Sequence, residues 1–244
     1  MEDPKTPTKS IKQEEEKTCD YYYKYQHVEH LGRSSTKGLL TGTVHVFHKV
    51  DGTNGKIWKD ENGVICAGSR NQKLDKKNTN QGFSTWVFSS EEIKNYMDNY
   101  PDDILFGEWL VPHQEKYIKD VIRVFYVFEV ITKRTVPGKT EQETVYQPYD
   151  DYINKLEEFG IKYIPRIATL VDPEHLSGQD LLEKTTFLTE KGAVGEGIVI
   201  KNYDYHNKYG HQTWGKIITS EFKEKKGVKH LSHGTTPFIQ LLQT

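Results

Sequence analysis

The fold of this chain is decided by Lys49-Val50-Asp51-Gly52-Thr53-Asn54, a short run between two predicted strands. On its N-terminal side, residues 43–50 alternate apolar and polar side chains, and this period of two predicts a half-buried strand. On its C-terminal side, residues 56–59 and 64–67 flank Asp60-Glu61-Asn62-Gly63, a turn ending in glycine that is typical of a β-hairpin. The run is therefore expected to lie where one strand ends and the next begins.

Further strands are predicted from apolar and aromatic runs at residues 104–110, 121–131, 197–202 and 214–219. Helices are predicted at residues 151–159, which Gly160 stops, and at about residues 178–190. Because strands outnumber helices and do not alternate regularly with them, the pattern favours an α+β fold over a doubly wound one.

One more helix is indicated by its own start signal. Ser89 is followed three residues later by Glu92, which is the spacing of a capping box. Ile93 and Met97 then lie at helical spacing, and Pro101 closes the segment. We therefore expect a helix whose N-cap is Ser89.

The composition excludes several classes of protein. Charged residues make up 28% of the chain but the formal net charge is only -2, so a nucleic-acid partner would have to be held by a local basic groove. No apolar run is long enough to cross a membrane, and the polar N-terminus lacks the apolar core of a secretory signal. Two cysteines, Cys19 and Cys66, are too few for a disulfide framework and fit a reducing compartment, so we expect an intracellular, cytoplasmic protein.

Lys49 is the candidate nucleophile. A lysine attacks only when deprotonated, and burial near other cations lowers its pKa from a reference value of about 10.4. Gly52 removes side-chain bulk where a nucleotide would approach, and Asp51 and Asn54 offer acceptors to a metal ion or to ribose hydroxyls. Taken alone, the run also fits a surface β-turn, because Asp-Gly is common in hairpin turns.

Five further segments change that weighting. In chain order they are Ser69-Arg70, Phe106-Gly107-Glu108-Trp109, Phe125-Tyr126-Val127-Phe128-Glu129-Val130, Glu196-Gly197-Ile198-Val199-Ile200-Lys201 and the stretch around Lys216. Together with the run at Lys49, they resemble motifs I, Ia, III, IIIa, IV and V of the covalent nucleotidyltransferase superfamily, in the expected order. DNA ligases and capping enzymes usually end the first motif with arginine. Asn54 therefore makes this chain similar to the RNA ligases, especially the RNA ligase 2 branch.

The resemblance implies a nucleotide-binding role for each matched residue, on a nucleotidyltransferase fold of antiparallel sheets flanked by helices. Lys49 would accept AMP, and Asn54 would also contact the nucleotide. Arg70 would hold its ribose or phosphate. Glu108 would accept a hydrogen bond from the ribose 2'-hydroxyl, and Phe128 would stack on adenine.

At the phosphates, the resemblance implies cations and metal ligands. Lys201 would contact the α-phosphate, and Lys216 would neutralise phosphate charge. Glu196 would orient a metal-water cluster, with Asp51 as a second metal residue. These cations and Mg²⁺ (or Mn²⁺) would stabilise charge on the transferred phosphoryl group.

Some of these residues could instead have a purely structural role. Phe128 lies in an apolar strand and could be plain core, while Arg70 could be an ordinary surface residue. Glu196 and Lys201 are five residues apart, so on one strand they would point to opposite faces unless a bulge intervened. The last motif usually has two lysines separated by one residue, whereas Lys216 is followed by isoleucines. Either Lys216 acts alone, or another lysine such as Lys223 substitutes.

The activity implied is ATP-dependent RNA ligation. The lysine would take AMP from ATP, pass it to the 5'-phosphate of an RNA strand, and a 3'-hydroxyl would then attack and release AMP. Two alternatives stay open. One is a ligase or adenylyltransferase with another acceptor, a DNA nick or an RNA cap. The other is a non-catalytic nucleic-acid-binding relic.

The domain organisation follows from the same motifs. We expect a disordered leader at residues 1–20, a nucleotidyltransferase domain at 21–226 and a short basic C-terminal tail at 227–244. Most ligases of the superfamily carry a second domain after the last motif, and 28 residues follow Lys216 here. No full C-terminal domain is therefore expected, which predicts a minimal catalytic domain, a fragment, or a protein that borrows a partner's RNA-binding module.

Overall fold

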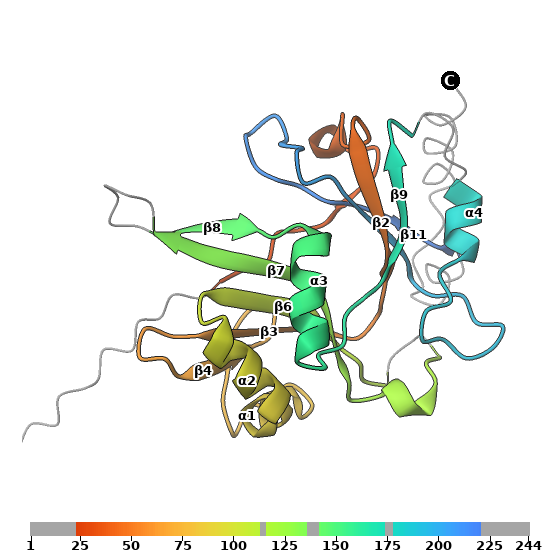
Figure 1. Ribbon diagram of the computed structural model, residues 1–244. Helices are drawn as coiled ribbons and strands as arrows, with labels where there is room; N and C mark the ends of the chain where they lie inside the picture. The colour runs from red at the N-terminus through yellow and green to blue at the C-terminus, as the bar shows by residue number, and fades with distance from the viewer. Residues whose placement is uncertain (1–22, 113–115, 136–141, 174–177, 221–244) are drawn as a thin grey trace, which may run out of the picture.

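The computed structural model describes residues 23–112, 116–135, 142–173 and 178–220. Two β-sheets form separate layers, with α1 (Phe83–Ser89) and α2 (Glu91–Asn99) against one sheet and α4 (Gly178–Glu183) against the other (Figure 1). α3 (Tyr149–Glu158) lies beside both sheets. The predicted α+β class is confirmed. The predicted leader and tail lie outside the described residues.

The five-stranded sheet has the order β1-β11-β10-β2-β9. Its strands are β1 (Glu29–His30), β2 (Thr43–Lys49), β9 (Arg166–Val171), β10 (Gly197–Lys201) and β11 (Gly215–Ile218). All neighbours are antiparallel except β1 and β11, which pair in parallel. The strands predicted at residues 43–50, 197–202 and 214–219 are confirmed to within one residue at each end. β1 and β9 lack a strong enough apolar pattern and were not expected.

The six-stranded sheet has the order β5-β4-β3-β6-β7-β8, and every neighbouring pair is antiparallel. Its strands are β3 (Thr53–Lys59), β4 (Ile65–Gly68), β5 (Lys73–Leu74), β6 (Asp103–Trp109), β7 (Phe125–Thr135) and β8 (Gln142–Tyr146). The predicted hairpin is confirmed as β3 and β4, with Gly63 at a φ of 75° in the turn. The prediction that a strand begins at residue 121 was wrong. Residues Lys119–Val121 form a short 3-10 helix, η2, and Arg123 turns the chain with a φ of 64°.

The predicted capping box was displaced by one residue. Ser90 is the N-cap of α2, and its hydroxyl accepts a hydrogen bond from the backbone N–H of Ile93. Ser89 instead ends α1 and donates its hydroxyl to the carbonyl of Thr85 at 3.0 Å. No sequence pattern indicated α1, so the boundary between two consecutive helices was misplaced. The amphipathic pattern itself was right, because Ile93, Tyr96 and Met97 are fully buried.

The third predicted helix is also shorter than expected. α4 ends at Glu183, whereas the expectation ran to residue 190. Thr185 and Thr186 follow, and such β-branched residues are restricted in a helix. Thr185 instead donates its hydroxyl to the carbonyl of Leu182, and its own carbonyl accepts from Gly195.

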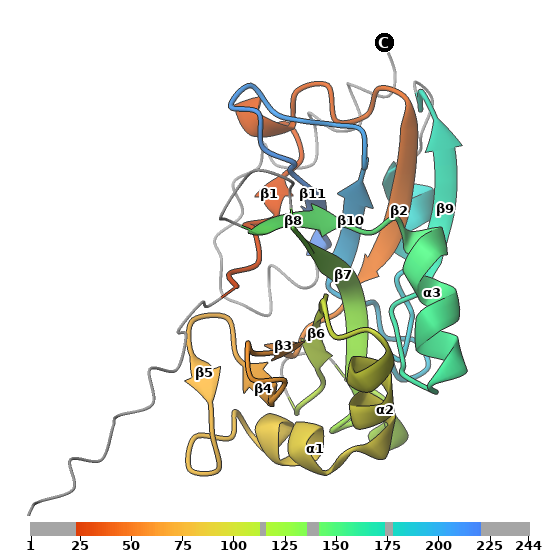
Figure 2. The ribbon, with the colours of Figure 1, turned by 60° about the vertical axis from the view of Figure 1, so that its left-hand side comes forward.

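The run that begins at Lys49 carries the chain from one sheet to the other. β2 belongs to the five-stranded sheet and β3 to the six-stranded sheet, with only residues 50–52 between them (Figure 2). Gly52 is required at this crossing, since a Cβ there would lie 2.6 Å from the backbone oxygen of Trp109. The expectation that this glycine makes room for a nucleotide was therefore wrong, because the space beside it is filled by β6.

Strand alternation gives the five-stranded sheet two different faces. Val44, Val46, Ile198 and Ile200 are fully buried on the face that packs against α4. Burying such a side chain stabilises a fold by about 1.5–3 kcal/mol. The residues between them point the other way, into a cleft that the six-stranded sheet closes.

Candidate active site

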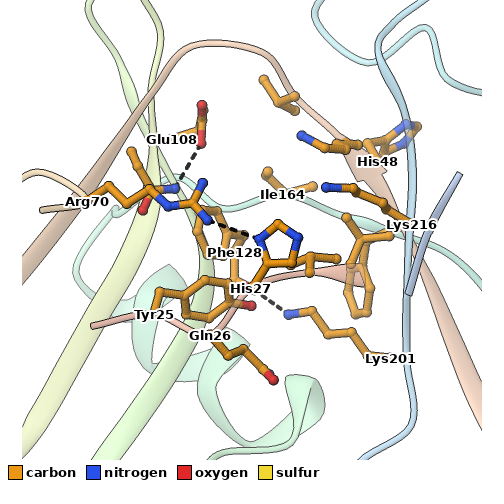
Figure 3. A pocket seen from close by; sticks show the side chains of 16 residues that line it. Tyr25, Gln26, His27, His48, Arg70, Glu108, Phe128, Ile164, Lys201 and Lys216 are labelled. Atoms are coloured by element: carbon orange, nitrogen blue, oxygen red, sulfur yellow. Dashed lines mark hydrogen bonds between the residues drawn. The ribbon is translucent and has the colours of Figure 1, made fainter. Parts of the chain in front are cut away.

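A cleft between the two sheets collects most of the predicted site residues. Those that line it are Lys49, Asn54, Arg70, Glu108, Phe128, Lys201 and Lys216. Figure 3 shows Glu108 and Arg70 entering from one side, and Lys201 and Lys216 entering from the other. The six-stranded sheet thus supplies the carboxylate and the aromatic ring, while the five-stranded sheet supplies the lysines.

Lys49 and Glu196 form an ion pair at one end of the cleft, which we call the open end. Nζ of Lys49 donates to Oε2 of Glu196 at 2.7 Å, and the two side chains are 24% and 8% exposed. Glu196 reaches this position because it precedes β10, so the alternation of that strand does not apply to it. Gly197, which follows it, lets β10 approach β11 closely, because a Cβ there would lie 2.0 Å from the carbonyl oxygen of Ile217.

Glu108 lies beside this ion pair on β6. Its Oε1 accepts a hydrogen bond from the backbone N–H of Gly52 at 3.0 Å, and its Oε2 lies 3.5 Å from the amide nitrogen of Asn54. Burial raises the pKa of the Glu108 carboxyl to about 7. The charge of Glu196 also raises this pKa, and the charge of Lys49 lowers it.

The residues predicted to bind a metal are not equally placed. Both are 6% exposed and neither is among the residues that line the cleft, but only Glu196 contacts a cleft residue, Nζ of Lys49. The backbone N–H of Asp51 donates to the hydroxyl of Tyr117 at 2.6 Å. In the described part of the chain, no three His, Cys, Asp or Glu side chains form a metal-binding group. Glu196 and Glu108 still fit Mg²⁺, which keeps several waters and needs few carboxylates.

Phe128 is brought into the cleft by a bulge in β7. Phe106 pairs with Glu129, but its neighbour Gly107 pairs with Val127, so Phe128 has no partner on β6. A bulge of this kind re-aims side chains that strict alternation would send to opposite faces. Phe128 accordingly lines the cleft and remains partly exposed, so it is not plain core.

Lys201 lies at the other end of the cleft, which we call the closed end. Its Nζ donates to Oε2 of Glu129 at 2.9 Å and to the carbonyl oxygen of Phe128 at 2.6 Å. The side chains of Lys201 and Glu129 are only 2% and 0% exposed. Lys201 and Glu196 are therefore not brought together, and each pairs with a different partner at a different end of the cleft.

Lys216 and Arg70 stand on opposite sides of the cleft (Figure 3). Partial burial lowers the pKa of Lys216, and the positive charge of Lys49 lowers it further. The guanidinium of Arg70 lies 3.4 Å from Nδ1 of His27. Lys223, which was named as a possible substitute for the second lysine of this motif, lies outside the described residues.

Sequence reasoning missed one part of the cleft entirely. Residues 23–28, which we call the N-terminal strap, lead into β1, and four of them line the cleft: Tyr25, Gln26, His27 and Val28. The ring of Tyr25 packs 5.1 Å from the rings of both Phe106 and Phe128. The cluster of tyrosines before Lys24 indicated where structure begins, but it carried no signal for which surface the segment covers.

The two-sheet fold is the nucleotidyltransferase-like fold of RNA ligases, and its cleft contains Lys49 and Glu108. The sequence model of the RNA ligase family matches residues 42–218, which is most of the chain. The protein belongs to the RNA ligase family. No curated protein sequence matches it.

Solved structures of RNA ligases share the fold at low sequence identity. An archaeal ATP-dependent RNA ligase matches 84% of this chain and 50% of its own, with a TM-score of 0.61 and 16% identity. A variant of Naegleria gruberi RNA ligase with ATP and Mn matches 84% of this chain and 58% of its own, with a TM-score of 0.59 and 16% identity. The present chain thus spans about half to three-fifths of the length of these ligases.

None of the helices in the described ranges is long and apolar enough to cross a membrane.

Proposed function

We propose that this chain is the catalytic domain of an ATP-dependent RNA ligase that joins 3'-hydroxyl and 5'-phosphate RNA ends. The observation that carries the proposal is the open end of the cleft. There the amine of Lys49 is exposed to the cleft and lies within 2.7 Å of Glu196, with Glu108 and Lys216 nearby. Membership of the RNA ligase family supports the choice of RNA as substrate.

In the proposed first step, the amine of Lys49 attacks the α-phosphorus of ATP. A P–N bond forms, the bond between the α-phosphorus and the bridging oxygen breaks, pyrophosphate leaves, and the proton that Nζ loses passes to solvent in the cleft. Glu196 holds the amine by one hydrogen bond and orients it for attack. Lys216 and Arg70 line the same cleft and would stabilise the charge on the phosphoryl group.

The nucleoside would lie between the two sheets. Phe128 is the stacking wall for the base, and Glu108 with Asn54 faces the ribose. Glu108 accepts a hydrogen bond from Gly52, which holds the carboxylate in place to accept from a ribose hydroxyl. Glu196 and Glu108 would hold Mg²⁺ or Mn²⁺, and that ion would supply charge neutralisation at the phosphates. The Naegleria gruberi ligase was solved with ATP and Mn, which supports the same pairing here.

In the second step, the 5'-phosphate of an RNA strand attacks the lysyl-AMP, and Lys49 leaves as the free amine. In the third step, a 3'-hydroxyl attacks the activated 5' end, forms the phosphodiester bond and releases AMP. A partner protein or a further segment that binds RNA would complete the site. The low cysteine content is our basis for proposing a reducing, cytoplasmic location.

The first test is transfer of label from α-labelled ATP to the protein. Lys49→Ala is expected to abolish labelling, because no other amine replaces the nucleophile. Lys59→Ala is the matched control, since Lys59 lies on β3 and pairs with Asp98 outside the cleft. Labelling of the Lys49→Ala protein at the wild-type level would overturn the proposal.

The acceptor is tested separately with a panel of nicked RNA duplexes, single-stranded RNA ends, nicked DNA and diphosphate-ended RNA. The proposal expects sealing of 3'-hydroxyl and 5'-phosphate RNA ends at a rate at least about tenfold above nicked DNA. Equal or faster sealing of DNA would replace RNA by DNA as the substrate. If the intact mass of the protein does not increase by one AMP on incubation with ATP and magnesium, the protein is instead a non-catalytic relic.

A further inference from the structure

The closed end of the cleft contains a buried charge network that the three steps above do not use. Three donors converge on Oε2 of Glu129: Nζ of Lys201 at 2.9 Å, Nε1 of Trp214 at 2.9 Å and the hydroxyl of Tyr25 at 3.2 Å. In the described part of the chain, the other oxygen of Glu129, Oε1, has no hydrogen-bond partner. Burying this many polar groups is costly, so we expect the network to hold particular parts of the protein in place.

The network joins three separate parts of the protein. Lys201 belongs to β10 of the five-stranded sheet, and Glu129 belongs to β7 of the six-stranded sheet. Tyr25 belongs to the N-terminal strap. Lys201 also donates to the carbonyl oxygen of Phe128, at the bulge that turns the Phe128 ring into the cleft (Figure 3). One ammonium group therefore fixes the position of the bulge relative to the opposite sheet.

The two lysines leave the five-stranded sheet at well-separated levels. On the five-stranded sheet, Lys49 is opposite Gly197 and His45 is opposite Lys201. Four residues at about 3.3 Å each separate these levels, so the two lysines start roughly 13 Å apart along one face. Phe47 and Val199 lie between them and line the cleft, which makes the middle of the cleft apolar.

The bonds of Lys201 leave it little freedom to reach a phosphate. Its ammonium has two oxygen partners and lies 4.9 Å from the centre of the Phe47 ring, and its side chain is 2% exposed. The α-phosphate would lie beside Lys49, four residues away along the sheet, and to reach it Lys201 would have to leave Glu129 buried without a counter-charge. Breaking a pair of this kind is strongly unfavourable.

We propose that Lys201, together with Glu129, is a positioning residue for the nucleobase and does not contact the phosphates. The pair fixes the Phe128 bulge and the Tyr25 end of the N-terminal strap, and these form the wall on which the base stacks. This inference rests on the proposed use of ATP, because it assigns a part of the same cleft to the base.

The test separates the two halves of the nucleotide. Adenosine carries the base without phosphates, and tripolyphosphate carries the phosphates without a base. Each is measured as a competitive inhibitor of self-adenylylation with magnesium present. The variant is Glu129→Gln made together with Lys201→Met, so that neither substitution leaves a buried charge alone.

We expect the double variant to bind adenosine about tenfold more weakly, since stacking of a base on an aromatic ring contributes about that factor. Its affinity for tripolyphosphate is expected to match the wild-type protein within about twofold.

Two controls accompany this measurement. Lys155→Met removes a lysine that pairs with Asp103 at 3.3 Å but does not line the cleft, and it should alter neither inhibition constant. Thermal unfolding with and without tripolyphosphate reports whether the double variant is folded. A folded double variant would show the same upward shift in Tm as the wild-type protein.

The opposite result overturns the inference. If tripolyphosphate affinity falls while adenosine affinity is kept, Lys201 is a phosphate contact. An equal fall for both probes, or no change for either, also removes the positioning role. All these outcomes differ from failure of the proposed function, in which the wild-type protein itself would take no AMP from ATP.

Discussion

The cleft has two lysine–glutamate pairs that differ in burial far more than in distance. Lys49 and Glu196 at the open end are 2.7 Å apart, and Lys201 and Glu129 at the closed end are 2.9 Å apart. The lysine at the open end is 24% exposed and the lysine at the closed end is 2% exposed. Both lysines project from the same face of the five-stranded sheet, so the sheet alone does not distinguish them.

The difference teaches that a charged residue in a motif can either take part in the reaction or hold the structure in place. The burial of its side chain distinguishes the two roles. The exposed amine of Lys49 has one carboxylate partner and can leave it at a small cost, because water replaces the lost contact. The buried ammonium of Lys201 has no such replacement. Motif resemblance assigned both lysines to the nucleotide, and only the structure shows their unequal surroundings.

The largest expected effect of this contrast is on stability. Lys201→Met should lower the free energy of unfolding by about 3–5 kcal/mol, because it leaves the carboxylate of Glu129 buried without a counter-charge. Lys49→Met should lower it by less, because the Lys49 side chain is 24% exposed and water reaches its ion pair. Urea unfolding of both variants at pH 8 measures the difference. Equal losses in the two variants would mean that burial does not distinguish the pairs.

A smaller effect is expected from pH at the open end. Burial raises the pKa of Glu108 from its ordinary value near 4.5 to about 7, so the folded state binds its proton more tightly than the unfolded state. Stability of the wild-type protein is therefore lost as pH rises through that interval. Glu108→Gln removes the titration, so its stability relative to wild type should increase by on the order of 1 kcal/mol between pH 5 and 8, allowing for solvent screening.

This pH effect is measured by urea unfolding at several pH values, with Glu158→Gln on the exposed end of α3 as the control. The control variant should follow the wild-type curve. A constant difference between Glu108→Gln and wild type across the whole interval would contradict the raised pKa.

The smallest effect is expected from salt. Raising KCl from 0.05 to 0.5 M should reduce the coupling energy between Lys49 and Glu196 by a few tenths of a kcal/mol, because ions screen a partly exposed pair. The coupling between Lys201 and Glu129 should not change. Double-mutant cycles at both salt concentrations give the two coupling energies. Equal screening of both pairs would show that solvent reaches the closed end.

Much of the fold could be predicted because its central strands carry strong patterns. β2, β10 and β11 have apolar side chains on the face that packs against α4, and their alternation is visible in the sequence. The errors fell at boundaries. Ser89 and Ser90 offer the same hydroxyl one residue apart, and only the presence of α1 decides which of them caps α2.

The sequence predicted which residues form the site, but it did not predict how they are arranged. Seven predicted residues line one cleft, because the motifs record the identities of those residues. The motifs do not record the bulge at Phe128 or the burial of Glu129, both of which depend on pairing between distant strands. The N-terminal strap escaped prediction for the same reason: its role comes from Tyr25 packing against Phe106 and Phe128.

The pairing of β2 with β10 has a consequence for the order in which the protein acquires its reactive centre. Lys49 and Glu196 are 147 residues apart in the chain, and contacts of such long range form slowly and late in folding. During synthesis from the N-terminus, Lys49 emerges long before its carboxylate partner exists. Nascent chains therefore hold an ordinary lysine at this position, and the proposed reaction with ATP becomes possible only when the second half of the chain has folded back onto β2.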